Sequence, residues 1–297
     1  MTGWNSGKTV DELCGWLPLA ILPLAAMLFA GSLPPWAFMW TLSLAIFFGL
    51  KWVTWWRERC KVSHPKWRSV AYLLAWPGMD ADAFLDPSQN VFAPALKNWL
   101  WAFLETVLGI VLLWVVARSV PNREPLIRGW IGMVGLIFTL HFGLFQIVAL
   151  VWQQFGVVAQ PIMNAPLRAT SLAEFWGKRW NLGFRQLAHE LIFRPTHRFL
   201  GAGLAGFLVF LVSGLIHDLV ISLPSRGGYG LPTLYFLIQG TGVMVERSRF
   251  GKSIGLTEGV RGWLFMTICL VAPVFWLFHP WFVMRVVIPF MGALHAI

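Results

Sequence analysis

The sequence predicts an all-α integral membrane protein, a polytopic bundle of about eight transmembrane helices. Three observations predict it: the composition, a series of long apolar runs, and the uneven distribution of Lys and Arg. Of the 297 residues, 57% are hydrophobic and only 12% are charged, whereas a soluble domain usually carries about a quarter charged residues. A water-facing surface cannot be built from this composition, so the chain is divided into apolar spans of roughly 20 residues each.

Eight apolar runs follow one another along the chain. The first begins after an N-terminus that holds one Lys and two acids, which favours an uncleaved first helix over a signal peptide. The sixth and eighth runs are short, and the eighth contains Arg285, so we expect either of them to be tilted, partly re-entrant or interfacial. The runs cover residues 16–33, 36–56, 100–117, 129–152, 201–223, 231–245, 262–278 and 281–297.

Basic residues are concentrated on one side of the predicted bundle. If the eight runs alternate across the membrane, Lys8 and residues 57–99, 153–199 and 247–261 share a side, and they hold 17 of the 23 basic residues. The positive-inside rule makes that side cytosolic, so both termini are predicted to be cytosolic. The net charge of +10 then follows from topology and from anionic lipid headgroups. A secondary interpretation is that part of the charge attracts an anionic, phosphate-bearing substrate.

Charge and cysteine content also exclude some classes of function. A nucleic-acid partner is not expected, because the basic residues are spread over membrane-proximal loops. The three cysteines, Cys14, Cys60 and Cys269, are widely separated and lack metal-ligand spacing, so they indicate neither a disulfide framework nor a zinc site. We expect no resident metal or cofactor, and the oligomeric state stays open.

Ionisable residues inside the apolar runs are the first candidates for a function. Such a group costs on the order of 3 kcal/mol by insertion scales, so it needs a reason to be there. His141 lies in the fourth run, and the neighbours His217 and Asp218 lie in the fifth. The alternative to a functional role is a histidine that bonds a neighbouring group and holds helices together. For His141 this alternative is the favoured one.

A polar helix is predicted near residues 171–195, before the fifth run. Ser171 followed three residues later by Glu174 is a capping box, which starts a helix. At helical spacing one face of this helix is polar and another carries Trp176 and Trp180. The pattern alone indicates an amphipathic or re-entrant helix at the interface, anchored by Trp, Arg and Lys. The polar face holds Glu174, Lys178, Asn181, Arg185 and His189.

Three ordered motifs resemble a known family. They are Phe175-Trp-Gly-Lys-Arg-Trp-Asn181, then Arg194-Pro195, then Ser213-Gly-Leu-Ile-His-Asp218. With segments at 71–80, 141–145 and 164–171, they are similar to the membrane-bound O-acyltransferase superfamily, in particular its wax-synthase-like branch. The resemblance runs from about residue 70 to 250.

The resemblance implies one membrane-embedded acyltransferase domain over residues 1–297, with acyl-CoA as co-substrate, an alcohol acceptor and a buried centre reached through a tunnel. Plant wax synthases tend to have Glu after the histidine where this chain has Asp218, so acceptor specificity is not carried over. Carried over by position, His217 is the catalytic histidine and Asn181 the active-site asparagine, while the substrate-binding or supporting residues are Trp176, Trp180, Arg179, Asp218 and His141.

The chemistry suits these residue types independently of the resemblance. Acyl transfer from a thioester to an alcohol requires removal of a hydroxyl proton, and a neutral imidazole such as that of His217 takes it during attack. An Asn side chain is both donor and acceptor, so Asn181 either orients the histidine or bonds the carbonyl as negative charge develops. Asp218 follows His217 on the same helix and points about 100° away, which favours a structural partner or an acceptor contact.

Two other classes of function fit parts of the sequence. Asp80, Asp82 and Asp86 could chelate Mg²⁺ on a diphosphate in a membrane prenyltransferase, and a metal requirement would favour that class. His141 and His217 could form a polar path in a transporter or channel. Such a protein would move substrate without making a product, and the lack of a detectable inverted repeat counts against it.

Overall fold

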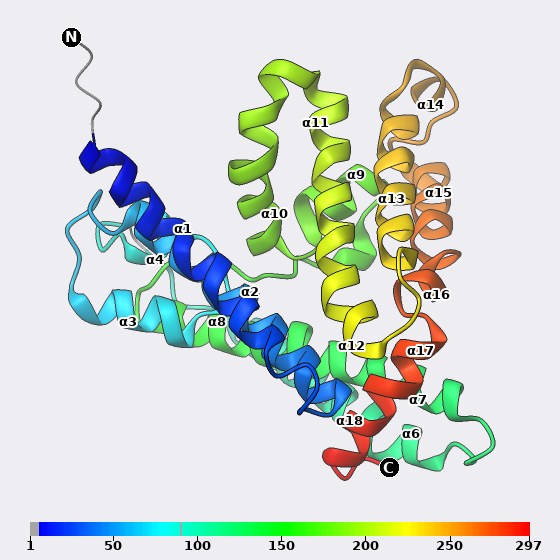
Figure 1. Ribbon diagram of the computed structural model, residues 1–297. Helices are drawn as coiled ribbons and strands as arrows, with labels where there is room; N and C mark the ends of the chain where they lie inside the picture. Colours follow the sequence, from blue (N-terminus) through cyan, green and yellow to red (C-terminus); the bar gives the residue numbers. More distant parts are fainter. Residues whose placement is uncertain (1–5, 90) are drawn as a thin grey trace.

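The computed structural model describes residues 6–89 and 91–297, and every regular element in that part of the chain is helical (Figure 1). The all-α prediction is confirmed. The side chains of residues 6–10, including that of Lys8, lie outside the described part. Among the described residues, five helical stretches are long and apolar enough to cross a membrane: Pro35–Glu58, Leu96–Ser119, Pro125–Gln154, Leu182–Ser225 and Gly259–Leu277.

The count of about eight spans is not confirmed, because three of the predicted runs fall outside these five stretches. The first run is covered by α1 (Ser6–Met27), which starts ten residues earlier than the run and carries Pro18 and Pro23. The sixth corresponds to α13 (Leu231–Arg247), which has 17 residues. The last corresponds to a shorter apolar helix, Pro280–Ala293.

The N-terminal helices α1 and α2 (Pro35–Glu58) form a pair that slants across one side of the molecule (Figure 1). Gly49 of α2 faces α1 so closely that a Cβ there would lie 2.7 Å from the Cα of Leu19. At the end of α2, a connecting region carries α3 (Lys66–Ala75) and α4 (Ala81–Leu85). This region packs on aromatic side chains, with Tyr72 and Phe84 fully buried.

Two broken helices form the next layer. The first is α5 (Leu96–Val111), continued by η1 (Leu112–Val116) and α6 (Ala117–Ser119). The second is α7 (Pro125–Ile137), η2 (Phe138–Leu144) and α8 (Phe145–Gln154). The η segments named here are π-helical turns, which widen a helix by one residue and are frequent at functional sites.

The region that carries the motifs forms a helical hairpin. A short 3₁₀ turn, η3 (Pro166–Arg168), precedes α9 (Leu172–Glu174) and η4 (Phe175–Arg179). The chain then rises through α10 (Leu182–Ala188) and η5 (His189–Phe193) into α11 (Arg194–His217). Gly201 has a φ of 72°, which only glycine adopts readily, and there the chain reverses, so the later part of α11 runs antiparallel to α10 (Figure 1).

Among the remaining helices, α13 is the one that packs along α11. After η6 (Asp218–Ser222) and α12 (Leu223–Ser225), α13 lies against α11, and a Cβ on Gly214 would lie 2.7 Å from the Cα of Thr233. Small residues at such crossings let membrane helices approach closely. The chain ends with α14 (Arg249–Ser253), α15 (Gly259–Val271), α16 (Val274–Leu277), α17 (Pro280–Phe282), η7 (Val283–Val287) and α18 (Ile288–Ala293).

The prediction of one continuous amphipathic helix over residues 171–195 is wrong. The helix that starts at Ser171 ends at Arg179, and Asn181 has a φ of 43°, in the left-handed region. A new helix begins at Leu182. The polar face expected on one continuous helix is therefore divided between two, and Asn181 occupies the corner between them.

Candidate active site

His217 ends α11, and its ring is held in one orientation. Its Nδ1 lies 2.7 Å from the carbonyl oxygen of Ser213. Because a carbonyl can only accept, Nδ1 carries the proton and donates. The other ring nitrogen, Nε2, then has a free lone pair. The ring also lies 4.4 Å from the ring of Phe236, centre to centre.

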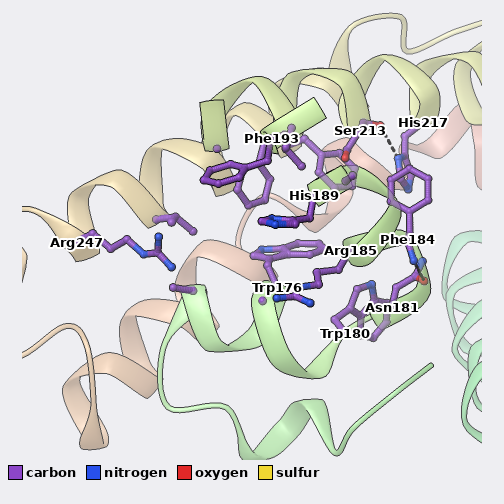
Figure 2. Close-up of a pocket in the computed structure, with 18 residues that line it drawn as sticks. Trp176, Trp180, Asn181, Phe184, Arg185, His189, Phe193, Ser213, His217 and Arg247 are labelled. Carbon is purple, nitrogen blue, oxygen red and sulfur yellow. Dashed lines mark hydrogen bonds between the residues drawn. The ribbon is translucent and has the colours of Figure 1, made fainter. Parts of the chain in front are cut away.

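A cavity of about 390 Å³ connects His217 with Asn181 and with three basic side chains. Its walls come from η4, α10, η5, α11 and α13. Figure 2 shows His217 and Asn181 at one end of the cavity and Arg247 at the other. Arg185 and His189 also line it. The sequence-predicted residues that share this cavity are His217, Asn181, Trp176 and Trp180.

The side-chain oxygen of Asn181 accepts a hydrogen bond from the helix that follows it. Its Oδ1 accepts a 3.3 Å hydrogen bond from the backbone N–H of Phe184, so Asn181 caps α10. Its own backbone N–H points to the sulfur of Met163 at 3.4 Å. Within the described chain its side-chain Nδ2 donates to no protein group, so the amide N–H donors of this cavity-lining side chain are uncommitted.

The two cavity-lining tryptophans both pack against aromatic rings. Trp180 stacks on Phe175, with ring centres 5.4 Å apart and an interplanar angle of 16°. Trp176 packs on Phe236 at 5.7 Å and donates its Nε1–H to Gln239 at 3.4 Å. The aromatic contacts fix the wall of the cavity beside His217.

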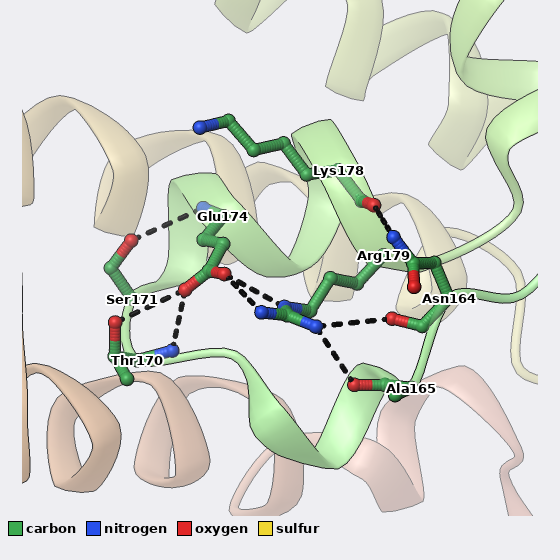
Figure 3. Close-up of polar contacts among 7 residues, drawn as sticks. All are labelled: Asn164, Ala165, Thr170, Ser171, Glu174, Lys178 and Arg179. Carbon is green, nitrogen blue, oxygen red and sulfur yellow. Dashed lines mark hydrogen bonds and ion pairs between the residues drawn. The ribbon is translucent and has the colours of Figure 1, made fainter.

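Glu174 and Arg179 close the turn before Asn181 (Figure 3). Ser171 Oγ accepts from the Glu174 N–H at 3.1 Å, as the capping box predicts. The Glu174 carboxylate, however, accepts from Thr170, through N–H at 2.8 Å and Oγ1 at 3.0 Å. It also pairs with Arg179 at 2.6 Å, and Arg179 reaches the carbonyl of Asn164 at 3.3 Å. The Thr170 N–H bond, then Arg179, hold the pKa of Glu174 below its ordinary value.

Glu246 is a supporting residue that the sequence reasoning missed. It lies at the end of α13, is 1% exposed, and accepts hydrogen bonds from the backbone N–H groups of Leu172 at 2.6 Å and Ala173 at 3.3 Å. It therefore caps the helix that leads to Trp176. An acid near a helix C-terminus interacts unfavourably with the helix dipole. The position of Glu246 at the end of an apolar run was therefore the one sequence signal that it has a partner in another segment.

Arg179, Asp218 and His141 do not line the cavity. Arg179 is engaged by Glu174. Asp218 accepts from Ser222 Oγ at 2.8 Å, from the N–H of Gly230 at 2.8 Å, and from both N–H and Oγ1 of Thr233, so it ties η6 to the start of α13.

His141 packs its ring against Phe145 at 5.3 Å, and its buried Nδ1 has no hydrogen-bond partner in the described chain.

Two members of the acidic cluster that could chelate Mg²⁺ make local hydrogen bonds instead. Asp80 accepts from the N–H of Ala83, and Asp86 accepts from Ser88. The presence of Arg247 in the cavity was also not predicted: it follows an apolar run in the sequence, and the fold places it in the same cavity as Arg185.

Comparison with known proteins gives consistent similarities. Residues 159–238 match the membrane bound O-acyl transferase family. The chain is 26% identical to probable long-chain-alcohol O-fatty-acyltransferase 3 of Arabidopsis thaliana, over 62% of this chain and 61% of the relative. Probable long-chain-alcohol O-fatty-acyltransferase 2 of the same plant is 33% identical, over 66% and 60%. Its acyl-CoA–sterol O-acyltransferase 1 is 31% identical, over 50% and 46%. The chain thus spans about three fifths of the length of the first two relatives.

Proposed function

We propose that this chain is a wax-synthase-like member of the membrane-bound O-acyltransferase superfamily and transfers an acyl group from acyl-CoA to the hydroxyl of a lipophilic alcohol, a proposal that its similarity to that family and to the plant relatives supports. The observation that carries the proposal is the geometry of His217. Its protonated Nδ1 is committed to the Ser213 carbonyl, so the base at Nε2 is available inside a cavity that also holds Asn181.

In the proposed reaction, Nε2 of His217 removes the hydroxyl proton as the alcohol oxygen attacks the thioester carbonyl carbon. A C–O bond forms, and the carbonyl oxygen gains negative charge in a tetrahedral intermediate. The C–S bond then breaks, the CoA thiolate leaves, and His217 returns the proton to the sulfur. General-base catalysis of this kind contributes roughly a hundredfold to ten-thousandfold.

Asn181 is assigned the second role. Its Oδ1 caps α10, which leaves only its N–H donors for the reaction. We therefore prefer a bond from Nδ2 to the developing oxyanion over orientation of His217. One donor of this type is worth about a hundredfold to a thousandfold in turnover.

Acyl-CoA as donor is supported by the mouth of the cavity. Arg185 and Arg247 line the cavity and carry charges that suit the phosphates of CoA. His189 stacks on Phe193 with ring centres 5.2 Å apart, and both line the cavity, offering a flat surface to an adenine base. The apolar interior between the mouth and His217 suits the acyl chain.

Mass spectrometry of cellular lipids tests the proposed function. Cells expressing the wild type should contain an ester that cells expressing His217→Ala lack, and its fragments identify acyl chain and acceptor together. Identical lipid profiles in both cultures, with both proteins inserted in membranes, would overturn the proposal.

A further inference from the structure

Asp218 follows His217 in the sequence, but its carboxylate serves another helix. Its Oδ1 accepts from the backbone N–H of Gly230 at 2.8 Å, and its Oδ2 accepts from the N–H of Thr233 at 3.0 Å and from the hydroxyl of the same residue. Gly230 is the N-cap residue of α13, and Thr233 is the third residue of that helix. Asp218 therefore caps the start of α13 from a different element, at the end where a negative charge interacts favourably with the helix dipole.

Phe236 connects this cap to the ring of His217. It stands one helical turn after Thr233 on α13, so the two side chains share a helix face. Its ring lies 4.4 Å from the ring of His217, centre to centre. Where α11 and α13 cross, a Cβ on Gly214 would lie 2.7 Å from the Cα of Thr233 and 3.3 Å from the Cβ of Phe236. Because the two helices are this close, a shift of the first turn of α13 would displace Phe236 relative to His217.

A chain of hydrogen bonds holds the Asp218 carboxylate in its capping orientation. His279 is fully buried, and its Nδ1 accepts from the N–H of Phe282 at 3.2 Å. The neutral ring therefore carries its proton on Nε2, which lies 3.3 Å from Oγ of Ser222. Ser222 Oγ in turn donates to Oδ1 of Asp218 at 2.8 Å. The chain runs from His279 through Ser222 to Asp218 and ends on an ionised carboxylate, which only accepts.

The ring of His217 is thus held from two sides. Its Nδ1 is bonded to the Ser213 carbonyl of its own helix, whereas the contact with Phe236 depends on the placement of α13. Asp218 is not among the described residues that line the His217 cavity, so it touches neither substrate of the proposed reaction. Its effect on the chemistry must pass through the ring, and a displacement of about 1 Å can cost a hundredfold in rate.

We propose that Asp218 is a positioning residue for His217: by capping α13 it fixes Phe236 against the imidazole and keeps Nε2 at the angle that proton transfer requires. This role rests on the proposed acyltransferase function. Loss of the cap should lower kcat, which depends on the geometry of the base. Binding of acyl-CoA should be unchanged, because Arg247 lies at the other end of the cavity (Figure 2), where Glu246 holds α13 separately.

A double-mutant cycle tests the role. Asp218→Asn should lower kcat about tenfold to a hundredfold, with KM for acyl-CoA unchanged. In a His217→Ala protein the same substitution should cause no further loss of rate, because a residue that acts only through the base has nothing left to position. An equal loss of rate in both backgrounds, or a wild-type kcat in folded Asp218→Asn, would overturn the proposal.

Thr233→Val is the second variant, and it leaves the charge of Asp218 in place. It removes the hydroxyl bond to Asp218 and keeps the backbone one, so kcat should fall less than in Asp218→Asn, and only while His217 is present. Thr241→Val is the matched control, because Thr241 is exposed on the same helix and its hydroxyl bonds the carbonyl of Leu237. It should turn over like wild type.

The Tm of each variant shows which comparison decides. If Asp218→Asn does not fold, Thr233→Val decides, and a kcat equal to that of Thr241→Val would overturn the proposal. Failure of the proposed function gives a different result, namely no ester from the wild type with any acyl donor.

Discussion

Lys51 donates a 2.7 Å hydrogen bond from its Nζ to the carbonyl oxygen of Gly78. The side chain is fully buried, and its Nζ also lies 3.1 Å from the centre of the Tyr72 ring. The loop it holds packs on the first turn of α10, where a Cβ on Gly183 would lie 3.2 Å from the backbone N of Met79. Lys51 thereby supports the helix that Asn181 caps.

Replacing this lysine should destabilise the protein. Lys51→Met keeps the volume but leaves the Gly78 carbonyl without its partner, at a cost of about 1–3 kcal/mol. We expect a lower Tm in detergent and a reduced turnover, measured beside Lys252→Met as an exposed control. A Tm equal to that of the control variant would show that the contact does not support the fold.

The Glu174 network predicts a pH dependence of stability. Because the folded pKa of Glu174 is depressed, its ionised form stabilises the fold fully above its ordinary pKa of about 4.3. That stabilisation is lost as pH falls through the lower folded value. The Tm difference between wild type and Glu174→Gln should be constant near neutral pH and shrink on acidification below about pH 4.3. The exposed Glu124→Gln should show no such trend, and a gap that widens in acid would contradict the assignment.

Much of the local architecture was predictable from the sequence. Composition, the series of apolar runs and the distribution of Lys and Arg together predict an all-α membrane protein, and the Ser171 cap is present where the pattern predicts it. The resemblance named four residues that one cavity brings together, although 36 positions separate Asn181 from His217. Their catalytic roles stay predictions.

What periodicity missed has physical reasons. A residue with left-handed backbone angles does not disturb the 3.6-residue spacing of polar side chains in the sequence. The interruption of the helix at Asn181 could therefore not be predicted from that spacing. Glu246 reaches Leu172 across 74 positions, a separation that no local pattern reveals. The span count failed where helices are short, as in α13.

The distribution of the basic residues predicts an orientation in the membrane if the eight apolar runs alternate across it. Tags at both termini should be cytosolic by the positive-inside rule. Protease protection in sealed vesicles measures this, with a tag on a known lumenal protein as the control. A terminal tag that is cleaved only after the vesicles are opened would contradict the orientation.

Variants of Asn181 separate its two roles. Asn181→Asp keeps a capping oxygen but loses the Nδ2 donors, so turnover should fall about a hundredfold or more with little loss of Tm. Asn181→Gly tolerates the positive φ and loses both cap and donor, so it should be inactive and slightly less stable. Near-normal turnover in Asn181→Asp would exclude the oxyanion role.

The central claim is that His217 is the general base. Its most direct test is the rate of acyl transfer by purified His217→Ala, measured beside His141→Ala, with Tm and acyl-CoA binding determined for each variant. His217→Ala should transfer acyl groups about a hundredfold or more slowly while binding acyl-CoA and folding like wild type, and His141→Ala should retain more activity. A folded His217→Ala protein that keeps most of its activity would contradict the account.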